Sequence, residues 1–193
     1  MPKHFFAMLA RMKYITRWGL MRNTRPENLS EHALEVAVLA HALALIGQKR
    51  LGLPLDPNRA ATLALFHDAP EILTGDLPTP VKYADPAIKS AYKQVEREAA
   101  GRLLDMLPED LREDYRPLLM PGPADTPLRP LIKAADKLSA LIKCIEEERA
   151  GNLEFRKAKE STLAAIHALD CEPAEIFLRE FIPSYTLTLD EQS

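Results

Sequence analysis

Four side chains with metal-binding chemistry stand where isolated polar groups are costly. His32 lies in an apolar helical stripe, His67 and Asp68 are adjacent at the end of another, and Asp136 interrupts an apolar run. An ionised carboxylate beside an apolar face is destabilising unless it is paired or bound to a cation. Taken singly, each residue also has an ordinary interpretation: a core histidine, a capped helix end, or a salt bridge to a neighbouring lysine.

Taken together, the two imidazoles and two carboxylates predict one metal site. A set of nitrogen and oxygen ligands with no thiolate suits Mn, Fe, Co, Ni or Mg more than a structural zinc site of the cysteine type. Protein ligands at four positions of an octahedral ion leave two positions for water and a substrate oxygen. Such an ion lowers the pKa of its water and polarises a phosphoryl oxygen, which indicates hydrolytic chemistry.

Glu71 is a candidate for proton transfer beside this site. It follows Asp68 by three residues and His67 by four, so helical spacing places all three on one face. A carboxyl group there could move a proton without binding the metal. The alternative for any single glutamate is a solvated position on the surface.

The residues that position these groups are expected to be helical, because apolar residues recur around them at spacings of three and four. Ser30 is the expected N-cap of the helix that carries His32. Asp56 and Pro57 open the helix that leads to His67. Helices are predicted over residues 4–15, 30–50, 57–70, 85–107, 108–119, 128–150, 153–169 and 173–182, and loops over residues 16–28, 74–84 and 120–127.

The composition is that of one ordinary globular domain spanning residues 1–193, with 47% hydrophobic and 27% charged residues. No segment predicts a strand, so the expected fold is all-α with about seven to nine helices. No stretch reaches the roughly 20 uninterrupted apolar residues of a membrane span, and no membrane partner is expected. Cys144 and Cys171 are interpreted as reduced core thiols of a cytoplasmic protein.

The charge distribution favours a small anionic substrate. The formal net charge is -3 and the pI is about 6.0, which gives no general case for nucleic-acid binding. Residues 1–26 nevertheless carry six basic residues and no acidic one. This asymmetry predicts a local cationic patch on an acidic body.

Longer segments around these residues resemble a known family. The order His32, His67-Asp68, Asp136 is the H…HD…D signature of the HD superfamily of metal-dependent phosphohydrolases. Three segments closely resemble the bacterial YfbR-type 5′-deoxynucleotidases: RWGLMRNTRPENLSEH (17–32), HDAPEILTGDLPTPVKY (67–83) and KAADKLSALIKCIEEERAGNLEF (133–155). The start HFFAMLARMKYI and the end IPSYTLTLDE are also similar, so the resemblance covers nearly the whole chain. It implies a single HD-domain helical bundle.

The resemblance also implies an activity. The expected reaction is hydrolysis of 2′-deoxyribonucleoside 5′-monophosphates to deoxynucleoside and phosphate, with selection against ribonucleotides. His32, His67, Asp68 and Asp136 would bind the metal, and cobalt, manganese or copper would be the activating ion. The enzyme would be a cytoplasmic homodimer.

The same resemblance implies roles for substrate-contacting residues. Arg17 would orient the phosphate, Glu71 would assist proton transfer, and Trp18 would press on the sugar where a ribose 2′-hydroxyl would sit. A guanidinium fork suits a phosphate, which agrees with the place of Arg17 in the basic segment. Lys82 is either a second cation near the phosphate or a solvated loop lysine. The residues expected to line the substrate are Arg17, Trp18, His32, Asp68, Asp76, Leu77, Pro78, Thr79 and Asp136, with Asp76 accepting a hydrogen bond from the 3′-hydroxyl.

Two other functions are compatible with the same predicted metal site. A cyclic phosphodiesterase or a nucleoside triphosphate hydrolase would use the same metal centre on another substrate, although triphosphate enzymes with this motif tend to be larger and more basic. A helical binding module would use the metal structurally. Glu71 beside the ligands and the open coordination positions argue against that second alternative.

Overall fold

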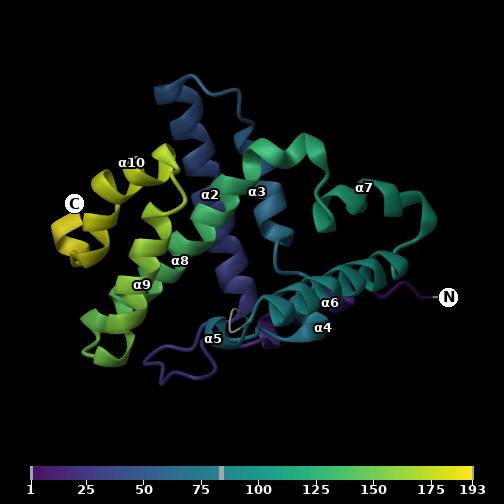
Figure 1. Ribbon diagram of the computed structural model, residues 1–193, viewed down its shortest axis with the longest axis horizontal. Coiled ribbons are helices and arrows are strands. Elements are labelled where there is room, and N and C mark those ends of the chain that lie inside the picture. Colours follow the sequence, from purple (N-terminus) through teal and green to yellow (C-terminus); the bar gives the residue numbers. More distant parts are fainter. Residues whose placement is uncertain (1, 83–84, 193) are drawn as a thin grey trace.

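The computed structural model describes residues 2–82 and 85–192, and within those residues the chain forms helices and no strands (Figure 1). The longer helices are α1 (Phe5–Leu9), α2 (Leu29–Leu51), α3 (Pro57–Phe66), α6 (Pro86–Asp105), α7 (Glu109–Leu119), α8 (Arg129–Arg149), α9 (Arg156–His167) and α10 (Glu172–Glu180). Single turns form α4 (Glu71–Thr74) and α5 (Thr79–Lys82), and 3₁₀ segments form η1 (Ala10–Tyr14), η2 (Pro123–Leu128), η3 (Leu153–Phe155), η4 (Ile182–Thr186) and η5 (Leu189–Gln192). The all-α prediction is confirmed.

Helix α2 is the centre of the fold and packs against α3, α8 and α10. In Figure 1 it runs through the middle of the molecule, with α9 and α10 on one side and α6 and α7 on the other. Its Val36 and Leu43 meet Leu63 of α3 and Leu138 of α8 in one buried apolar cluster. Each such side chain contributes about 1.5–3 kcal/mol by leaving water, so this cluster fixes the helices that carry the predicted ligands.

The apolar composition of α2 follows from this central position. By length and composition alone, Leu29–Leu51 could cross a membrane. In the structure, however, 56% of its most apolar window is buried inside the protein. Most apolar side chains of α2 therefore lie in the core against α3, α8 and α10, while Leu34 and Val38 are exposed.

The start of α2 corrects one prediction. Asn28, and not Ser30, is the N-cap. The Asn28 side chain accepts hydrogen bonds from the backbone N–H groups of Ser30 and Glu31, and the Glu31 carboxylate accepts from the backbone N–H of Asn28. This reciprocal capping box satisfies amide groups that Ser30 could not reach. Asp56 and Asp85, which stand at the predicted starts of two helices, are the N-caps of α3 and α6.

Several predicted helix and loop boundaries differ from the structure, because short helical turns have too few residues to show a periodic spacing of apolar side chains. The predicted helix 4–15 is α1 followed by the 3₁₀ segment η1, and the predicted break at 120–127 is mostly the 3₁₀ segment η2. The predicted loop 74–84 contains α5, where Pro78 O accepts from the N–H groups of Val81 and Lys82. Residues 83–84 of that predicted loop lie outside the described residues. Cys144 and Cys171 are free and buried, as predicted.

Candidate metal centre

The predicted ligands come together from three separate segments. One ligand atom each of His32, His67 and Asp68 lies within 4.8 Å of the other two. Asp68 Oδ2 is 3.1 Å from His67 Nε2 and 3.5 Å from His32 Nε2. Asp136 Oδ1 lies 3.3 Å from His32 Nε2. The geometry therefore gathers the two imidazoles and two carboxylates that the sequence singled out.

Helix packing explains this convergence. His32 lies in the second turn of α2 and is fully buried. His67 is the C-cap of α3, and Asp68 follows in the turn that leads into α4. Asp136 projects from α8, and its observed partner is His32 and not the neighbouring lysine of the ordinary interpretation. Because α2 packs on both α3 and α8, the core determines the distance between the ligands.

The outer ring nitrogens fix the tautomers of both histidines. His67 Nδ1 lies 2.7 Å from the carbonyl oxygen of Ala64, which can only accept, so Nδ1 carries the proton. His32 Nδ1 lies 3.0 Å from Ser139 Oγ, whose hydroxyl donates to Glu35 Oε2 at 2.5 Å. In both rings the Nε2 lone pair is then directed toward the carboxylates, the arrangement that metal-binding histidines require.

These atoms fit a divalent cation. His32 Nε2 and His67 Nε2 are buried and have no hydrogen-bond partner among the described residues. Burial would lower the pKa of His67, yet the carboxylates of Asp68 and Asp136 raise it to about 9. The centre therefore favours a positive charge beside these nitrogens, and a divalent ion supplies that charge in place of a proton.

The carboxylates remain ionised in this field. Burial alone would raise the pKa of Asp68 and of Asp136. The adjacent imidazoles His67 and His32 outweigh burial and hold both pKa values below their ordinary range. With a divalent ion in place of the proton, the ionised carboxylates and then neutral imidazoles would form the nitrogen and oxygen set that hard and borderline divalent ions prefer.

Glu71 lies beside the centre and is 4% exposed, so the surface alternative is wrong. Its Oε2 is buried without a hydrogen-bond partner among the described residues, and its Oε1 lies 3.6 Å from Lys82 Nζ. Burial, followed by the charges of Asp68 and Asp76, raises the pKa of Glu71 to about 8. A carboxyl group with this pKa can hold a proton near neutral pH, as a general acid must.

Arg17 reaches the centre from the loop that precedes α2. Its Nη1 lies 3.7 Å from Asp68 Oδ2, and its side chain is 11% exposed. Burial would lower the pKa of this guanidinium, but surrounding carboxylates, led by Glu27, raise it. Other basic residues of the first segment are spread out: Arg11 and Lys13 lie against the Tyr14 ring, and Arg25 pairs with Glu31. The predicted cationic patch thus contributes Arg17 to the centre.

Trp18 is held in an unusual backbone conformation. Its φ is 60°, in the left-handed region that bulky residues rarely adopt. Its indole Nε1 donates to Glu27 Oε2 at 2.7 Å, and its ring lies 5.3 Å from that of Phe155. Such strain costs about 1–3 kcal/mol and persists where surrounding contacts over-determine it, which is common at binding sites.

The loop that carries Arg17 and Trp18 is anchored to the end of α8. Glu147, 1% exposed, accepts hydrogen bonds from the backbone N–H groups of Thr24 and Arg25 and from the Thr24 hydroxyl. Lys143 donates to the carbonyl oxygen of Arg25 and pairs with Glu147. Asn152 donates to Glu147 and to the carbonyl oxygen of Arg22. A buried polar network therefore holds loop 16–28.

The second predicted substrate segment lies beside the same charges. Asp76 is half-buried; burial raises its pKa, and Arg17 opposes that shift. Leu77 and Pro78 are half-buried and continue toward α5. The structure describes the backbone of Thr79 but not its side chain, so the prediction for that side chain lies outside the described residues.

Lys82 has a structural partner. Its Nζ donates to Glu96 Oε1 of α6 at 2.7 Å and lies 4.7 Å from the centroid of the Tyr92 ring. Burial would lower the pKa of Lys82, but Glu96 raises it. Lys82 is therefore a cation that joins α5 to α6 and faces Glu71, and not a solvated lysine.

Three residues that support the centre are not predicted from the sequence. Ser139 and Glu35 orient His32, and Glu27 holds both Arg17 and Trp18. Ser139 follows Asp136 by three residues, and Glu35 follows His32 by three. That helical spacing was the available signal, whereas Glu27 in a loop had none.

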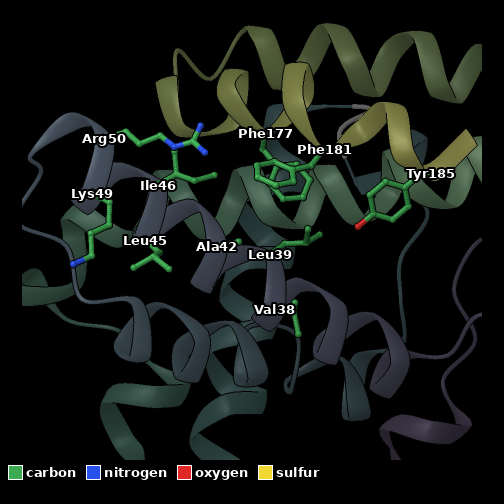
Figure 2. Close-up of a pocket in the computed structure, with 10 residues that line it drawn as sticks. All are labelled: Val38, Leu39, Ala42, Leu45, Ile46, Lys49, Arg50, Phe177, Phe181 and Tyr185. Carbon is green, nitrogen blue, oxygen red and sulfur yellow. The ribbon is translucent and has the colours of Figure 1, made fainter. Parts of the chain in front are cut away.

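An apolar groove further along α2 is distinct from this centre (Figure 2). It encloses about 500 Å³ between α2, α10 and η4. Phe177, Phe181 and Tyr185 face α2 across it, and Lys49 and Arg50 stand at one end. Its lining has no carboxylate or imidazole, so the groove cannot provide the metal ligands.

Comparisons with known proteins identify relatives along almost the whole chain. The family model described as 5′-deoxynucleotidase YfbR-like matches residues 4–185. A 5′-deoxynucleotidase of Vibrio cholerae is 52% identical over 190 residues, which cover 98% of each chain. A 5′-deoxynucleotidase of Shewanella oneidensis is 50% identical over 188 residues, which cover 97% of this chain and 96% of that one.

Solved structures share the fold. An HD-domain phosphohydrolase from Listeria innocua superposes with a TM-score of 0.83 at 23% identity, covering 98% of this chain and 91% of that one. The cyanophage S-2L HD phosphohydrolase, solved with dA and one catalytic Zn²⁺ ion, superposes with a TM-score of 0.65 at 22% identity, covering 94% of this chain and 96% of that one.

Proposed function

The chain belongs to the YfbR-like family of 5′-deoxynucleotidases, and on this premise we propose that His32, His67, Asp68 and Asp136 form its catalytic metal centre. It is a hydrolase of the 5′-deoxynucleotidase class. Its substrates are 2′-deoxyribonucleoside 5′-monophosphates, which it converts to deoxynucleoside and phosphate. The observation that carries the proposal is the convergence of two imidazole Nε2 atoms and the Asp68 carboxylate, beside Arg17.

The metal is a divalent ion. When bound, such an ion polarises a phosphoryl oxygen and neutralises charge that develops during hydrolysis. We take cobalt, manganese or copper as the activating ions from the family likeness. The nitrogen and oxygen donors support any of the three, because such donors bind many divalent metals.

Arg17 orients the phosphate in this proposal. Its Nε faces Glu27, and its terminal Nη1 lies on the side of Asp68. A planar guanidinium fixed in this way can donate to phosphate oxygens and hold the phosphorus close to the metal ligands. The reacting bond then stays at one position relative to Glu71.

Glu71 moves the proton that the reaction requires. Water adds to phosphorus, the bond between phosphorus and the 5′-oxygen breaks, and the departing 5′-oxygen takes up a proton. The Glu71 carboxyl group is placed to donate that proton, because it is buried, is adjacent to Asp68 and has a pKa raised to about 8 by burial. Lys82 at 3.6 Å stabilises the carboxylate that remains.

Trp18 and the segment Asp76–Thr79 select the deoxyribose. A pocket that only excludes an added hydroxyl group discriminates by about 10²-fold. A rigid indole improves on simple exclusion, because Arg17 fixes the phosphate and the sugar cannot move away from the ring. The strained backbone of Trp18 and its contact with Phe155 support this rigidity.

Phosphate release from a panel of nucleotides tests the substrate class. We expect dAMP to be hydrolysed, and dADP, dATP and a cyclic 3′,5′-nucleotide to release little or no phosphate under the same conditions. Faster release from dATP would favour a triphosphate hydrolase, and cleavage of the cyclic nucleotide would favour a phosphodiesterase.

The enzyme acts, we propose, as a cytoplasmic homodimer without nucleic-acid or membrane partners. The free, buried thiols Cys144 and Cys171 fit a reducing compartment. Dimerisation rests on family likeness. Light scattering coupled to size-exclusion chromatography measures it, and a mass near 21.6 kDa would contradict the dimer.

A further inference from the structure

Glu27 joins two residues with different proposed tasks. One atom, Glu27 Oε2, accepts a hydrogen bond from Trp18 Nε1 at 2.7 Å and from Arg17 Nε at 3.3 Å. The carboxylate is 13% exposed, so water competes weakly for these bonds. The phosphate-orienting guanidinium and the sugar-selecting indole therefore share one anchor.

The backbone holds this anchor in place. Arg17 N donates to Glu27 O at 3.0 Å, and Leu29 N donates to Ile15 O at 2.9 Å. Thr16 and Asn28 form an isolated antiparallel bridge between these two hydrogen bonds. The two ends of loop 16–28 are thus paired, which sets Glu27 directly opposite Arg17 and Trp18.

Glu27 is the residue that restrains both the Arg17 and the Trp18 side chains. Trp18 has a left-handed backbone, which alone does not fix the rotation of its indole. Phe155 limits the ring on one side, and the hydrogen bond to Glu27 sets the ring's in-plane direction. Arg17 is surrounded by carboxylates, of which Glu27 contributes most to stabilising its charge and binds its Nε edge.

We propose that Glu27 is the positioning residue that couples phosphate binding to sugar selection in this enzyme. The inference rests on the proposed roles of Arg17 and Trp18. Glu27 acts through those two side chains and not through the reacting atoms. Its other oxygen, Oε1, lies 3.9 Å from His32 Nδ1, beyond hydrogen-bond distance and on the side of the ring away from the carboxylates of the centre. Its loss should therefore raise KM and reduce the preference for deoxyribose together, while kcat changes less.

The test uses an optical signal that is independent of activity. Trp18 is the only tryptophan in the chain, so intrinsic fluorescence reports on this indole alone. We would measure acrylamide quenching of the whole protein, and kcat and KM for dAMP and AMP, in wild type, Glu27→Ala and Glu27→Gln. The matched control is Glu154→Gln, which removes an exposed carboxylate that accepts from Arg22 N of the same loop.

Glu27→Ala and Glu27→Gln should distinguish the effect of the hydrogen bond to Trp18 from the effect of the ion pair with Arg17. Glu27→Ala should increase quenching, raise the KM for dAMP about tenfold and lower the dAMP-over-AMP ratio of kcat/KM by a similar factor, since each lost bond is of that size. Glu27→Gln retains an oxygen for the indole but not the charge beside Arg17. It should keep quenching near wild type while KM rises, and it also keeps the proposal testable if Glu27→Ala does not fold.

The outcomes distinguish this inference from the function on which it rests. Wild-type enzyme that treats dAMP and AMP alike would contradict the proposed sugar selection. Wild-type discrimination combined with unchanged quenching, KM and ratio in Glu27→Ala would overturn the role of Glu27 alone. Glu154→Gln should match wild type in all three measurements.

Discussion

The metal centre and loop 16–28 are positioned by opposite kinds of contact. His32, His67 and Asp136 sit on or at the ends of helices that apolar side chains pack together. The loop instead depends on buried polar groups, chiefly the Glu147 carboxylate, which accepts several hydrogen bonds. The centre that performs the reaction thus rests on the core, while the segment that selects the substrate rests on charges and hydrogen bonds.

This difference predicts that changes at the two regions will have separable effects. Changes at the centre should abolish chemistry and leave the fold largely intact. Changes in the loop should alter substrate preference, or make stability depend on pH, while catalysis continues.

The largest effect is expected for Asp68→Ala. Its Oδ2 lies against both imidazoles, so the substitution should remove the metal and turnover together. Ser139→Ala, which removes only the group that orients His32, should cost roughly 10–100-fold in activity or affinity. Elemental analysis and kcat on dAMP measure both variants, and full turnover of Asp68→Ala would contradict the assignment.

A loss smaller than that of Asp68→Ala, but larger than that of Ser139→Ala, is expected for Glu71→Gln. If the carboxyl group moves a proton and does not bind the metal, kcat should fall roughly 10²–10⁴-fold while metal content stays that of wild type. Loss of the metal would instead identify Glu71 as a ligand. An unchanged kcat would remove it from the mechanism.

Trp18→Ala should change selectivity more than rate. Without the indole the ribose 2′-hydroxyl is admitted, so the dAMP-over-AMP ratio of kcat/KM should fall by up to about 10²-fold. Each tenfold change in that ratio corresponds to about 1.4 kcal/mol of discrimination. An unchanged ratio would move the selection to the segment Asp76–Thr79.

The smallest effect concerns acid stability. Burial would raise the pKa of Glu147, but Lys143, Asn152 and Thr24 hold it well below its ordinary value. The ionised Glu147 carboxylate stabilises the folded protein at pH values above the pKa of this group in the unfolded chain, which is near 4.5. This stabilisation is lost as the pH falls toward the lower pKa of Glu147 in the folded protein. One such group changes the free energy of unfolding by at most about 1.4 kcal/mol per pH unit.

Urea unfolding between pH 5 and pH 3 measures this slope. Glu147→Gln should have a shallower dependence on pH than wild type. Glu160→Gln, which removes an exposed carboxylate of α9, is the matched control and should keep the wild-type slope. Equal slopes in wild type and Glu147→Gln would contradict a stabilising role for the ionised carboxylate.

The sequence predicted the all-α class and the long helices because their apolar spacing extends over several turns. It also identified His32, His67, Asp68 and Asp136 as one set, since each is a polar group at an apolar helical position or helix end, and the structure brings them together. The metal and catalytic roles of these residues stay predictions.

Capping rules and helical periodicity do not predict features that depend on only a few residues or on contacts between distant segments. Asn28 and Ser30 are equally good capping residues by type, and only the reciprocal hydrogen bond with Glu31 identifies Asn28 as the N-cap. The single turn α5 is too short to show periodicity. Glu27 and Glu147 act across loop contacts, with Glu147 meeting Thr24 from 123 positions away, and no local pattern encodes such a pairing.

The most direct test of the proposed metal-dependent deoxynucleotidase activity is the kcat/KM for dAMP and AMP before chelation, after chelation and after metal is restored. We expect turnover of dAMP to disappear on exhaustive chelation and to return with cobalt or manganese, and the rate on AMP to stay far lower throughout. Full turnover of dAMP by the chelated protein, or equal kcat/KM for the two nucleotides, would contradict the proposed activity.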